Sequence, residues 1–163
     1  MDRRTVLIGN DHGGFDLAGR VLKHVKARGI PAARVGSFSR KIVRYPYYAA
    51  RVAGAVSRGD VARGILICST GIGMSVIANK FKGVRASVCT STYMGRMTRA
   101  HNDSNILCLG GQITGTLEAL DILDAWLDTA YEGGRHSISL SLIAEAEEKL
   151  CNPGGWTPRG PMR

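Results

Sequence analysis

The sequence predicts an α/β protein with one five-stranded, mostly parallel sheet that helices cover on both faces. Short apolar runs alternate along the chain with longer stretches whose apolar residues recur every three or four positions, which is the spacing of a helix with one buried face. Strands and helices that alternate in this way are typical of βαβ crossovers. The chain of 163 residues is long enough for one such domain, which we place at residues 1–150.

The N-terminal part of the chain predicts a strand, a helix and a second strand. Thr5–Gly9 is an apolar run that ends in a polar, glycine-rich turn, as a strand at a ligand-binding edge would. The apolar residues of 15–25 have helical spacing, and the helix ends before Pro31 because proline cannot continue it. A short apolar run at Ala33–Val35 predicts the second strand, which leads into a loop rich in basic residues.

The middle of the chain predicts a helix, a buried strand and another helix. Pro46 suits the first turn of a helix that runs to about Ser57. Ile65–Cys68 is typical of a strand buried on both faces because all four residues are apolar. A glycine-rich turn follows this strand and begins a helix that ends near Lys80.

The C-terminal part continues the alternation of strands and helices. The remaining predicted elements are a strand at Ala86–Cys89, a helix at 92–100, a strand at Ile106–Leu109 and helices at 114–130 and 136–150. Leu117 and Trp126 are among the apolar positions expected to bury the face of the 114–130 helix. Residues 151–163 hold three of the five prolines, and we expect an extended C-terminal tail there.

The composition excludes several classes of protein. Hydrophobic residues make up 44% and charged residues 21%, which is an ordinary globular mixture rather than a disordered or fibrous one. No apolar run approaches the ~20 residues of a membrane span, and the N-terminus does not resemble a secretory signal, so we expect a cytoplasmic protein. The four cysteines lack C-x-x-C spacing and paired histidines, so we expect no disulfide, no metal and no cofactor.

The net charge of +9 is unevenly distributed. Residues 1–100 hold 18 basic and 4 acidic side chains, whereas residues 101–163 hold 4 basic and 9 acidic ones. Such asymmetry is compatible with nucleic acid, with a small phosphorylated substrate or with a solvated face. The arginines are spread over separate elements without a basic run, so we expect neither a nucleic-acid nor a membrane partner.

The segment Cys68–Ser75 is the first candidate for chemistry. Cys68 ends a buried strand at a glycine-rich turn, and the N–H groups that begin the next helix can bind an anion or lower the pKa of a thiol. No lysine follows the glycines, which excludes a nucleoside-triphosphate loop, and Val76 stands where a dinucleotide fingerprint needs a third glycine. A structural cysteine beside a tight turn remains the alternative.

Two histidines flank predicted strands. His12 follows Asp11 after the first strand, and His101 precedes the fifth strand together with Asn102 and Asp103. Imidazoles titrate near neutral pH, and ligands of open parallel sheets bind beyond the carboxyl ends of the strands. We therefore expect both histidines near that one edge of the sheet, although a lone histidine beside a loop is more often a packed or capping residue.

Five motifs in register resemble the type B ribose-5-phosphate isomerases, a family that includes the galactose-6-phosphate isomerase subunits. The resemblance spans about residues 4–150. The motifs are Asn10–Gly14, Tyr45-Pro46, Ile65–Ser75 with Ala78–Lys80, Arg99–Asn105 and Tyr131–His136.

The resemblance implies a three-layer α/β/α sandwich with a five-stranded, parallel, Rossmann-like sheet. It also implies metal-independent aldose–ketose isomerisation of a sugar phosphate through an enediolate, without a cofactor. Members of the family act as homodimers, or as dimers of dimers, with active sites built from both subunits.

Roles for individual residues follow from the same resemblance. It implies that Cys68 is the base that moves a proton between C1 and C2, and that His101 opens the sugar ring. Thr70 and the turn around it would hold the enediolate. The residues of that turn are Ser69, Gly71, Ile72 and Gly73. The residues implied to bind the hydroxyls or the phosphate are Asp11, His12, Tyr45, Asn102 and Arg135.

Two departures from the family pattern leave the natural sugar open. Family members usually carry arginine where this chain has Gln112 and Ser139, and neither side chain can replace the bidentate, charge-assisted contacts of arginine with a phosphate. The substrate is therefore ribose 5-phosphate (with ribulose 5-phosphate) or a related sugar. The alternative is a catalytically silent protein on the same scaffold that binds a sugar phosphate or nucleic acid.

Overall fold

The sheet has five strands, and every neighbouring pair is parallel. The computed structural model describes residues 2–150. The strand order is β2-β1-β3-β5-β4, so β3 lies at the centre of the sheet. The strands are β1 (Val6–Asn10), β2 (Ala32–Arg34), β3 (Arg63–Cys68), β4 (Ala86–Val88) and β5 (Ile106–Gly110).

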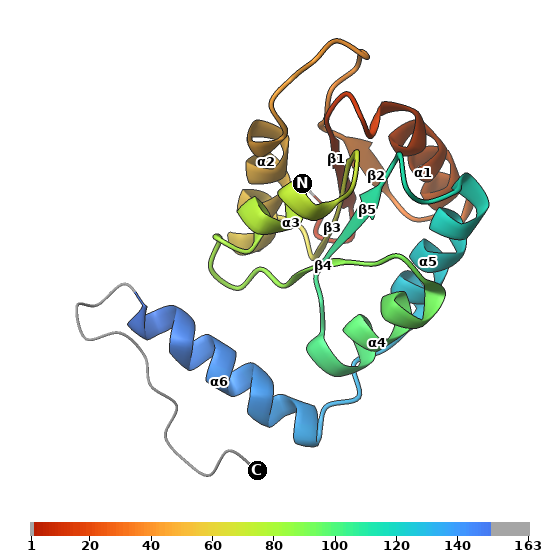
Figure 1. Ribbon diagram of the computed structural model, residues 1–163. Coiled ribbons are helices and arrows are strands. Elements are labelled where there is room, and N and C mark those ends of the chain that lie inside the picture. The colour runs from red at the N-terminus through yellow and green to blue at the C-terminus, as the bar shows by residue number, and fades with distance from the viewer. Residues whose placement is uncertain (1, 151–163) are drawn as a thin grey trace.

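Helices form a layer on each face of this sheet (Figure 1). One layer contains α1 (Phe15–Ala27), α4 (Thr92–Asn102) and α5 (Thr116–Asp128), and the other contains α2 (Tyr45–Ser57) and α3 (Ile72–Ala78). The arrangement confirms the predicted three-layer α/β/α sandwich. The five strands and six helices expected from the sequence all occur within residues 2–150, each close to its predicted bounds.

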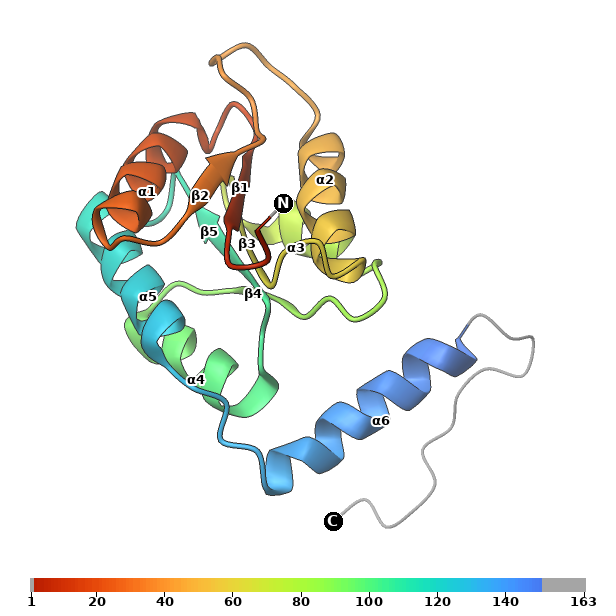
Figure 2. The same ribbon diagram turned by 180° about the vertical axis from the view of Figure 1, so that it is seen from behind.

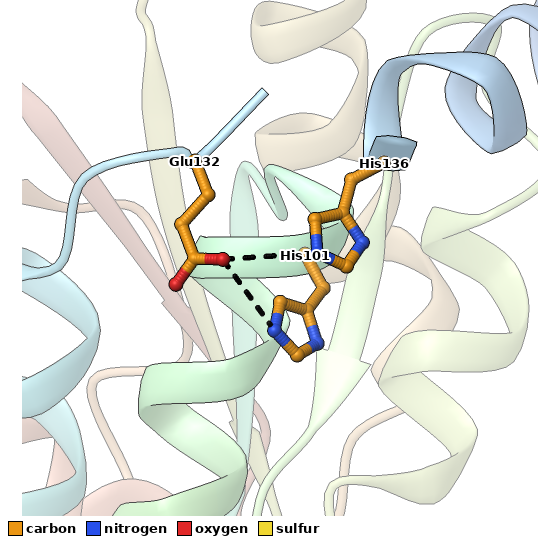
Figure 3. Close-up of side chains that lie close together, drawn as sticks. All are labelled: His101, Glu132 and His136. Carbon is orange, nitrogen blue, oxygen red and sulfur yellow. Dashed lines mark ion pairs between the residues drawn. The ribbon is translucent and has the colours of Figure 1, made fainter. Parts of the chain in front are cut away.

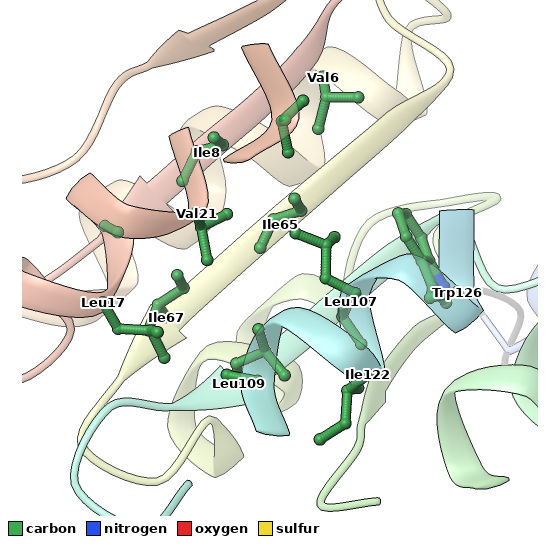
Figure 4. Close-up of a cluster of buried hydrophobic side chains, with 14 of the residues drawn as sticks. Val6, Ile8, Leu17, Val21, Ile65, Ile67, Leu107, Leu109, Ile122 and Trp126 are labelled. Carbon is green, nitrogen blue, oxygen red and sulfur yellow. The ribbon is translucent and has the colours of Figure 1, made fainter. Parts of the chain in front are cut away.

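Alternation along the strands divides the core between the two faces of the sheet, because successive side chains of a strand point to opposite faces. Ile65 and Ile67 of β3 pack toward α1 and α5, in a cluster that includes Trp126 (Figure 4). Leu66 and Cys68 pack toward α2 and α3 on the other face. Cys68 therefore ends the central strand on the side of the sheet that α3 covers.

Leu117 of helix α5 was expected on the buried face of the helix, but it is 79% exposed. The buried face of the helix consists of Ala119, Ile122, Leu123, Trp126 and Leu127. At about 100° per residue, Leu117 lies roughly 140° around the helix from Ile122. The prediction that Leu117 belongs to the buried face is wrong because Ile122, Leu123 and Trp126 together fix the face that meets the sheet.

Helix α6 (Arg135–Lys149) has no buried residue and extends beside the sandwich rather than into it (Figures 1 and 2). Its distal part is hydrogen-bonded to the body where Glu147 accepts from the Gly83 N–H at 3.0 and 3.1 Å. A cavity of about 470 Å³ lies between this helix and the body and is lined in part by Leu142 and Ile143. The expected tail, 151–163, lies outside the described residues.

Within residues 2–150, no helix combines the length and apolar character that crossing a bilayer requires.

Candidate active site

The carboxyl ends of β1, β3 and β5 meet at one edge of the sheet. Register places Asn10 opposite Ile67 and Cys68 opposite Gly110. The Gly111 N–H donates to the Cys68 carbonyl at 2.7 Å, and the Gln112 N–H donates to the Ser69 carbonyl at 3.0 Å. These bonds fix the turn after β3 against the turn after β5.

Cys68 lies beneath a turn whose backbone donates to its sulfur. The Gly71 N–H donates to Cys68 Sγ at 3.1 Å, and the Ile72 N–H donates to Thr70 Oγ1 at 3.3 Å. Gly71 has a φ of +78°, in the left-handed region that favours glycine, and a Cβ there would lie 3.1 Å from the Leu109 carbonyl carbon. Glycine at position 71 therefore allows the N–H to reach the sulfur at this close approach.

The turn after β1 packs directly on the turn after β3. Asp11 Oδ1 accepts hydrogen bonds from the Gly13 and Gly14 N–H groups at 2.8 and 3.1 Å, which fixes the start of α1. A Cβ on Gly13 would overlap Ser69 Oγ, so only glycine allows this contact. Among the described residues no hydrogen bond to Asp11 Oδ2 is present, so this second carboxylate oxygen can accept a hydrogen bond from a ligand hydroxyl.

His12 and Tyr45 complete the same edge. The Val43 N–H donates to His12 Nδ1 at 3.3 Å, so the neutral imidazole carries its proton on Nε2 and can donate from there. The ring of Tyr45 lies against Gly73, where a Cβ would stand 2.8 Å from Tyr45 Cζ. The structure thus brings together Asp11, His12, Tyr45 and Cys68.

The other two buried cysteines, Cys89 and Cys108, have raised thiol pKa values. Burial raises the pKa of Cys89 to about 11, and burial together with the neighbouring thiols raises the pKa of Cys108 well above its ordinary value. Both thiols are therefore protonated near neutral pH and act as small apolar side chains.

His101, Asn102 and Arg135 lie away from this edge. Helix α4 runs antiparallel to the strands and returns the chain to the amino end of β5, so its last residues precede Ile106. Gly64 pairs with Ile106, and four residue steps along β3, about 13 Å, separate that level from Cys68. The expectation that His12 and His101 of one chain lie at the same edge of the sheet is wrong. A βαβ crossover must return the chain to the opposite edge before the next parallel strand begins, and His101 lies at the end of that return.

At this second location His101 belongs to a cluster with Glu132 and His136 (Figure 3). The two imidazoles stack with ring centroids 4.1 Å apart and an interplanar angle of 11°. Glu132 Oε2 lies 3.8 Å from His101 Nε2 and 3.7 Å from His136 Nε2. Burial of the imidazole, with His101 and Arg135 beside it, lowers the pKa of His136.

Glu132 and His136 are not among the site residues predicted from the sequence. Both lie in the motif Tyr131–His136, which was the available signal. Gly133 and Gly134 have φ values of +67° and +56°, and the turn that they form sets His136 back beside the end of α4. Within the described residues, His101, Glu132 and His136 also form a group whose ligand atoms are close enough together to hold a metal ion.

The chemistry of the two locations is complementary. The carboxyl edge offers a thiol, oriented N–H donors and hydroxyl-binding groups, which suit proton abstraction next to a carbonyl and stabilisation of the resulting oxyanion. The end of α4 offers imidazoles and the exposed Arg135, which suit proton transfer to a ring oxygen and contact with an anion. Gln112 and Ser139 are both exposed.

Comparison with known proteins agrees with this chemistry. The sequence model of the Ribose/Galactose Isomerase family matches residues 6–143. Ribose-5-phosphate isomerase B of Escherichia coli is 42% identical over 146 residues, which is 90% of this chain and 98% of that protein. D-erythrulose-4-phosphate isomerase of Pectobacterium atrosepticum is 34% identical over 89% of this chain and 96% of its own length. The solved structure of Clostridium thermocellum ribose-5-phosphate isomerase B is 45% identical, with a TM-score of 0.87 over 88% of this chain and 97% of that chain.

Proposed function

Because the chain belongs to the Ribose/Galactose Isomerase family, we propose that it is an aldose–ketose isomerase that acts on a sugar phosphate through an enediolate. The observation that carries the proposal is the position of Cys68, at the end of the central strand and beneath the Gly71 N–H. Asp11, His12 and Tyr45 border the same turn. They can orient the hydroxyls of a linear sugar above the sulfur.

The reaction needs one base and one set of oxyanion donors. The thiolate of Cys68 removes the proton from C2 of the aldose, and the electron pair of the broken C–H bond forms the C1–C2 double bond of the enediolate. Negative charge moves to the oxygen on C1, where Thr70 and the N–H groups of the turn stabilise it. Cys68 then returns the proton to C1, the proton of the C2 hydroxyl passes to the oxygen on C1, and the ketose results with no net consumption of protons.

A second copy of the chain supplies the rest of the site in this proposal. His101 and Asn102 end α4 just before β5 begins, and the start of β5 lies about 13 Å along the strand direction from Cys68, so one chain does not bring these residues and the thiol to the same small sugar. Arg135 begins α6, whose start is tied to the end of α4. The exposed Ile138 and Ile143 of α6 and the adjoining cavity of about 470 Å³ provide a surface for that copy. A homodimer, or a dimer of dimers, would set His101 of one subunit against the turn after β3 of the other.

His101 opens the sugar ring in this arrangement. Aldopentose phosphates are mostly cyclic, and an imidazole that exchanges a proton with the ring oxygen gives the linear aldehyde. Arg135 would contact the phosphate and Asn102 a sugar hydroxyl. Glutamine and serine at 112 and 139 leave the phosphate with fewer charged partners, so a related sugar, such as a tetrose phosphate, is a substrate candidate beside ribose 5-phosphate.

A coupled assay of ribose 5-phosphate conversion to ribulose 5-phosphate, in EDTA, tests the proposal. We expect activity that survives the chelator and a kcat at least ~10²-fold lower in Cys68→Ala, because positioned acid–base groups contribute about that much. Unchanged activity in Cys68→Ala would remove Cys68 as the base. If no sugar phosphate in a panel of tetroses, pentoses and hexoses is converted, the chain is a silent sugar-phosphate or nucleic-acid binder on this scaffold.

A further inference from the structure

We propose that His101, Glu132 and His136 form a Zn²⁺ site at the end of α4, and that zinc bound there inhibits the isomerase. The binding part of the proposal stands on the geometry of one chain. The inhibitory part rests on the proposed function, because it requires His101 to take part in turnover.

The ligand atoms are already close to the separations that zinc needs. One atom from each residue lies within 4.8 Å of the other two, and the carboxylate lies 3.7 and 3.8 Å from the two Nε2 atoms (Figure 3). In a tetrahedral site with metal–ligand bonds near 2.0–2.1 Å, ligand atoms lie about 3.3 Å apart. Binding therefore requires movements of about half an ångström to 1.5 Å.

The stacked rings must also turn so that both Nε2 lone pairs point to one ion. Rotation about the Cβ–Cγ bond of histidine is broad and inexpensive, so this adjustment uses a soft torsion. The side chains are 35% exposed at His101, 17% at His136 and 59% at Glu132, which gives the ion a path from solvent. The carboxylate is the most exposed of the three ligands and therefore has the most room to move toward the ion.

The backbone holds the three ligands beside one another before any ion binds. The Glu132 N–H donates to the Ala100 carbonyl at 3.0 Å, which ties the segment before α6 to the end of α4. The His136 N–H donates to the Gly133 carbonyl at 3.1 Å and closes the turn from which α6 starts. The fold therefore already restricts the backbone of all three ligands, so metal binding loses less conformational entropy than it would in a flexible chain.

The donor set favours zinc over the common hard cations. Two imidazoles and one carboxylate suit zinc and similar transition metals, whereas Mg²⁺ and Ca²⁺ prefer oxygen ligands alone. Three protein ligands leave a fourth position for water, as in zinc sites that are not purely structural. Bound zinc would occupy Nε2 of His101, the atom that proton transfer to a sugar ring needs, and would fasten the start of α6 to α4.

Isothermal titration of the full chain with zinc chloride tests the binding, and Cys68→Ala is the background of choice. That substitution removes a competing thiol and the proposed base together, so the binding result does not depend on the isomerase activity. We expect about one zinc ion per chain at this site, with affinity at least about tenfold weaker in His136→Ala and also reduced in Glu132→Gln. The imidazole NMR signals of His101 and His136 should shift together.

His24→Ala is the matched control, because His24 lies on α1 and pairs with Asp124 at 2.7 Å, away from the cluster. Zinc affinity should be unchanged in this variant. Equal zinc affinity in His136→Ala, Glu132→Gln and the control would show that the cluster is not the zinc site. If His136→Ala fails to fold, the zinc affinity of Glu132→Gln alone decides this.

Steady-state turnover of the wild-type chain tests the inhibition. Zinc should lower the rate on a cyclic aldose phosphate, EDTA should restore it, and His24→Ala should be inhibited in the same way. Zinc bound at the cluster without loss of turnover would overturn the inhibitory role. A chain that converts no sugar phosphate would instead contradict the proposed function, while the titration would still decide whether the metal site exists.

Discussion

Substituting Gly71 tests whether the N–H above Cys68 serves the reaction. Gly71 has a φ of +78°, and the Cβ of an alanine there would lie 3.1 Å from the carbonyl carbon and 3.2 Å from the carbonyl oxygen of Leu109. Backbone atoms of β5 cannot move aside as a flexible side chain could. The turn itself must therefore shift, and it carries the N–H that now lies 3.1 Å from Cys68 Sγ.

The expected loss of stability follows from the backbone conformation. A non-glycine residue in the left-handed region costs about 1–2 kcal/mol. For a chain of this size, that lowers Tm by roughly 2–8 °C. The activity should fall further than stability explains, by at least about tenfold, because the shifted turn displaces the N–H that donates to Cys68 Sγ and, with it, the neighbouring donors that would face the enediolate.

Gly59→Ala separates the two effects. Gly59 has a φ of +77°, and nothing lies within 4 Å of its Cβ position, so alanine there meets the same backbone strain without a contact. Thermal unfolding and steady-state kinetics on ribose 5-phosphate should give a similar loss of Tm in both variants, but a reduced kcat in Gly71→Ala alone. A kcat for Gly71→Ala within twofold of that for Gly59→Ala would refute a catalytic role for the turn.

Three further predictions concern the thiols, the ring-opening group and the phosphate. Iodoacetamide at pH 8 should label Cys68 before Cys89, because a pKa of about 11 leaves only about 0.1% of Cys89 as thiolate. Peptide mass spectrometry measures the labelling of both cysteines, and faster labelling of Cys89 would contradict the prediction. His101→Ala should reduce kcat/KM far more for cyclic ribose 5-phosphate than for erythrose 4-phosphate, which cannot cyclise, and equal losses would exclude ring opening. The double variant Gln112→Arg/Ser139→Arg should lower KM for ribose 5-phosphate, because hydrogen bonds from the new arginines to the charged phosphate contribute roughly 1.5–3 kcal/mol each. An unchanged KM would show that the phosphate binds elsewhere.

The sequence by itself determined the elements of the fold and one half of the candidate site. Apolar periodicity is a local property, so Ile65–Cys68 identified a buried central strand and the spacing over residues 15–25 identified α1. Residues that directly follow a strand lie at its carboxyl end in any parallel sheet. The sequence alone therefore places Asp11, His12 and the turn after Cys68 together.

Only the tertiary structure decided where the remaining site residues lie. His101 precedes a strand, and the direction of α4 across the sheet puts it at the amino end of β5, opposite to the edge expected. Its contact with His136 joins residues 35 positions apart through two glycines of positive φ, a conformation that apolar spacing does not encode. The exposure of Leu117 has the same origin, because periodicity marks several apolar positions and packing against the sheet selects which of them are buried.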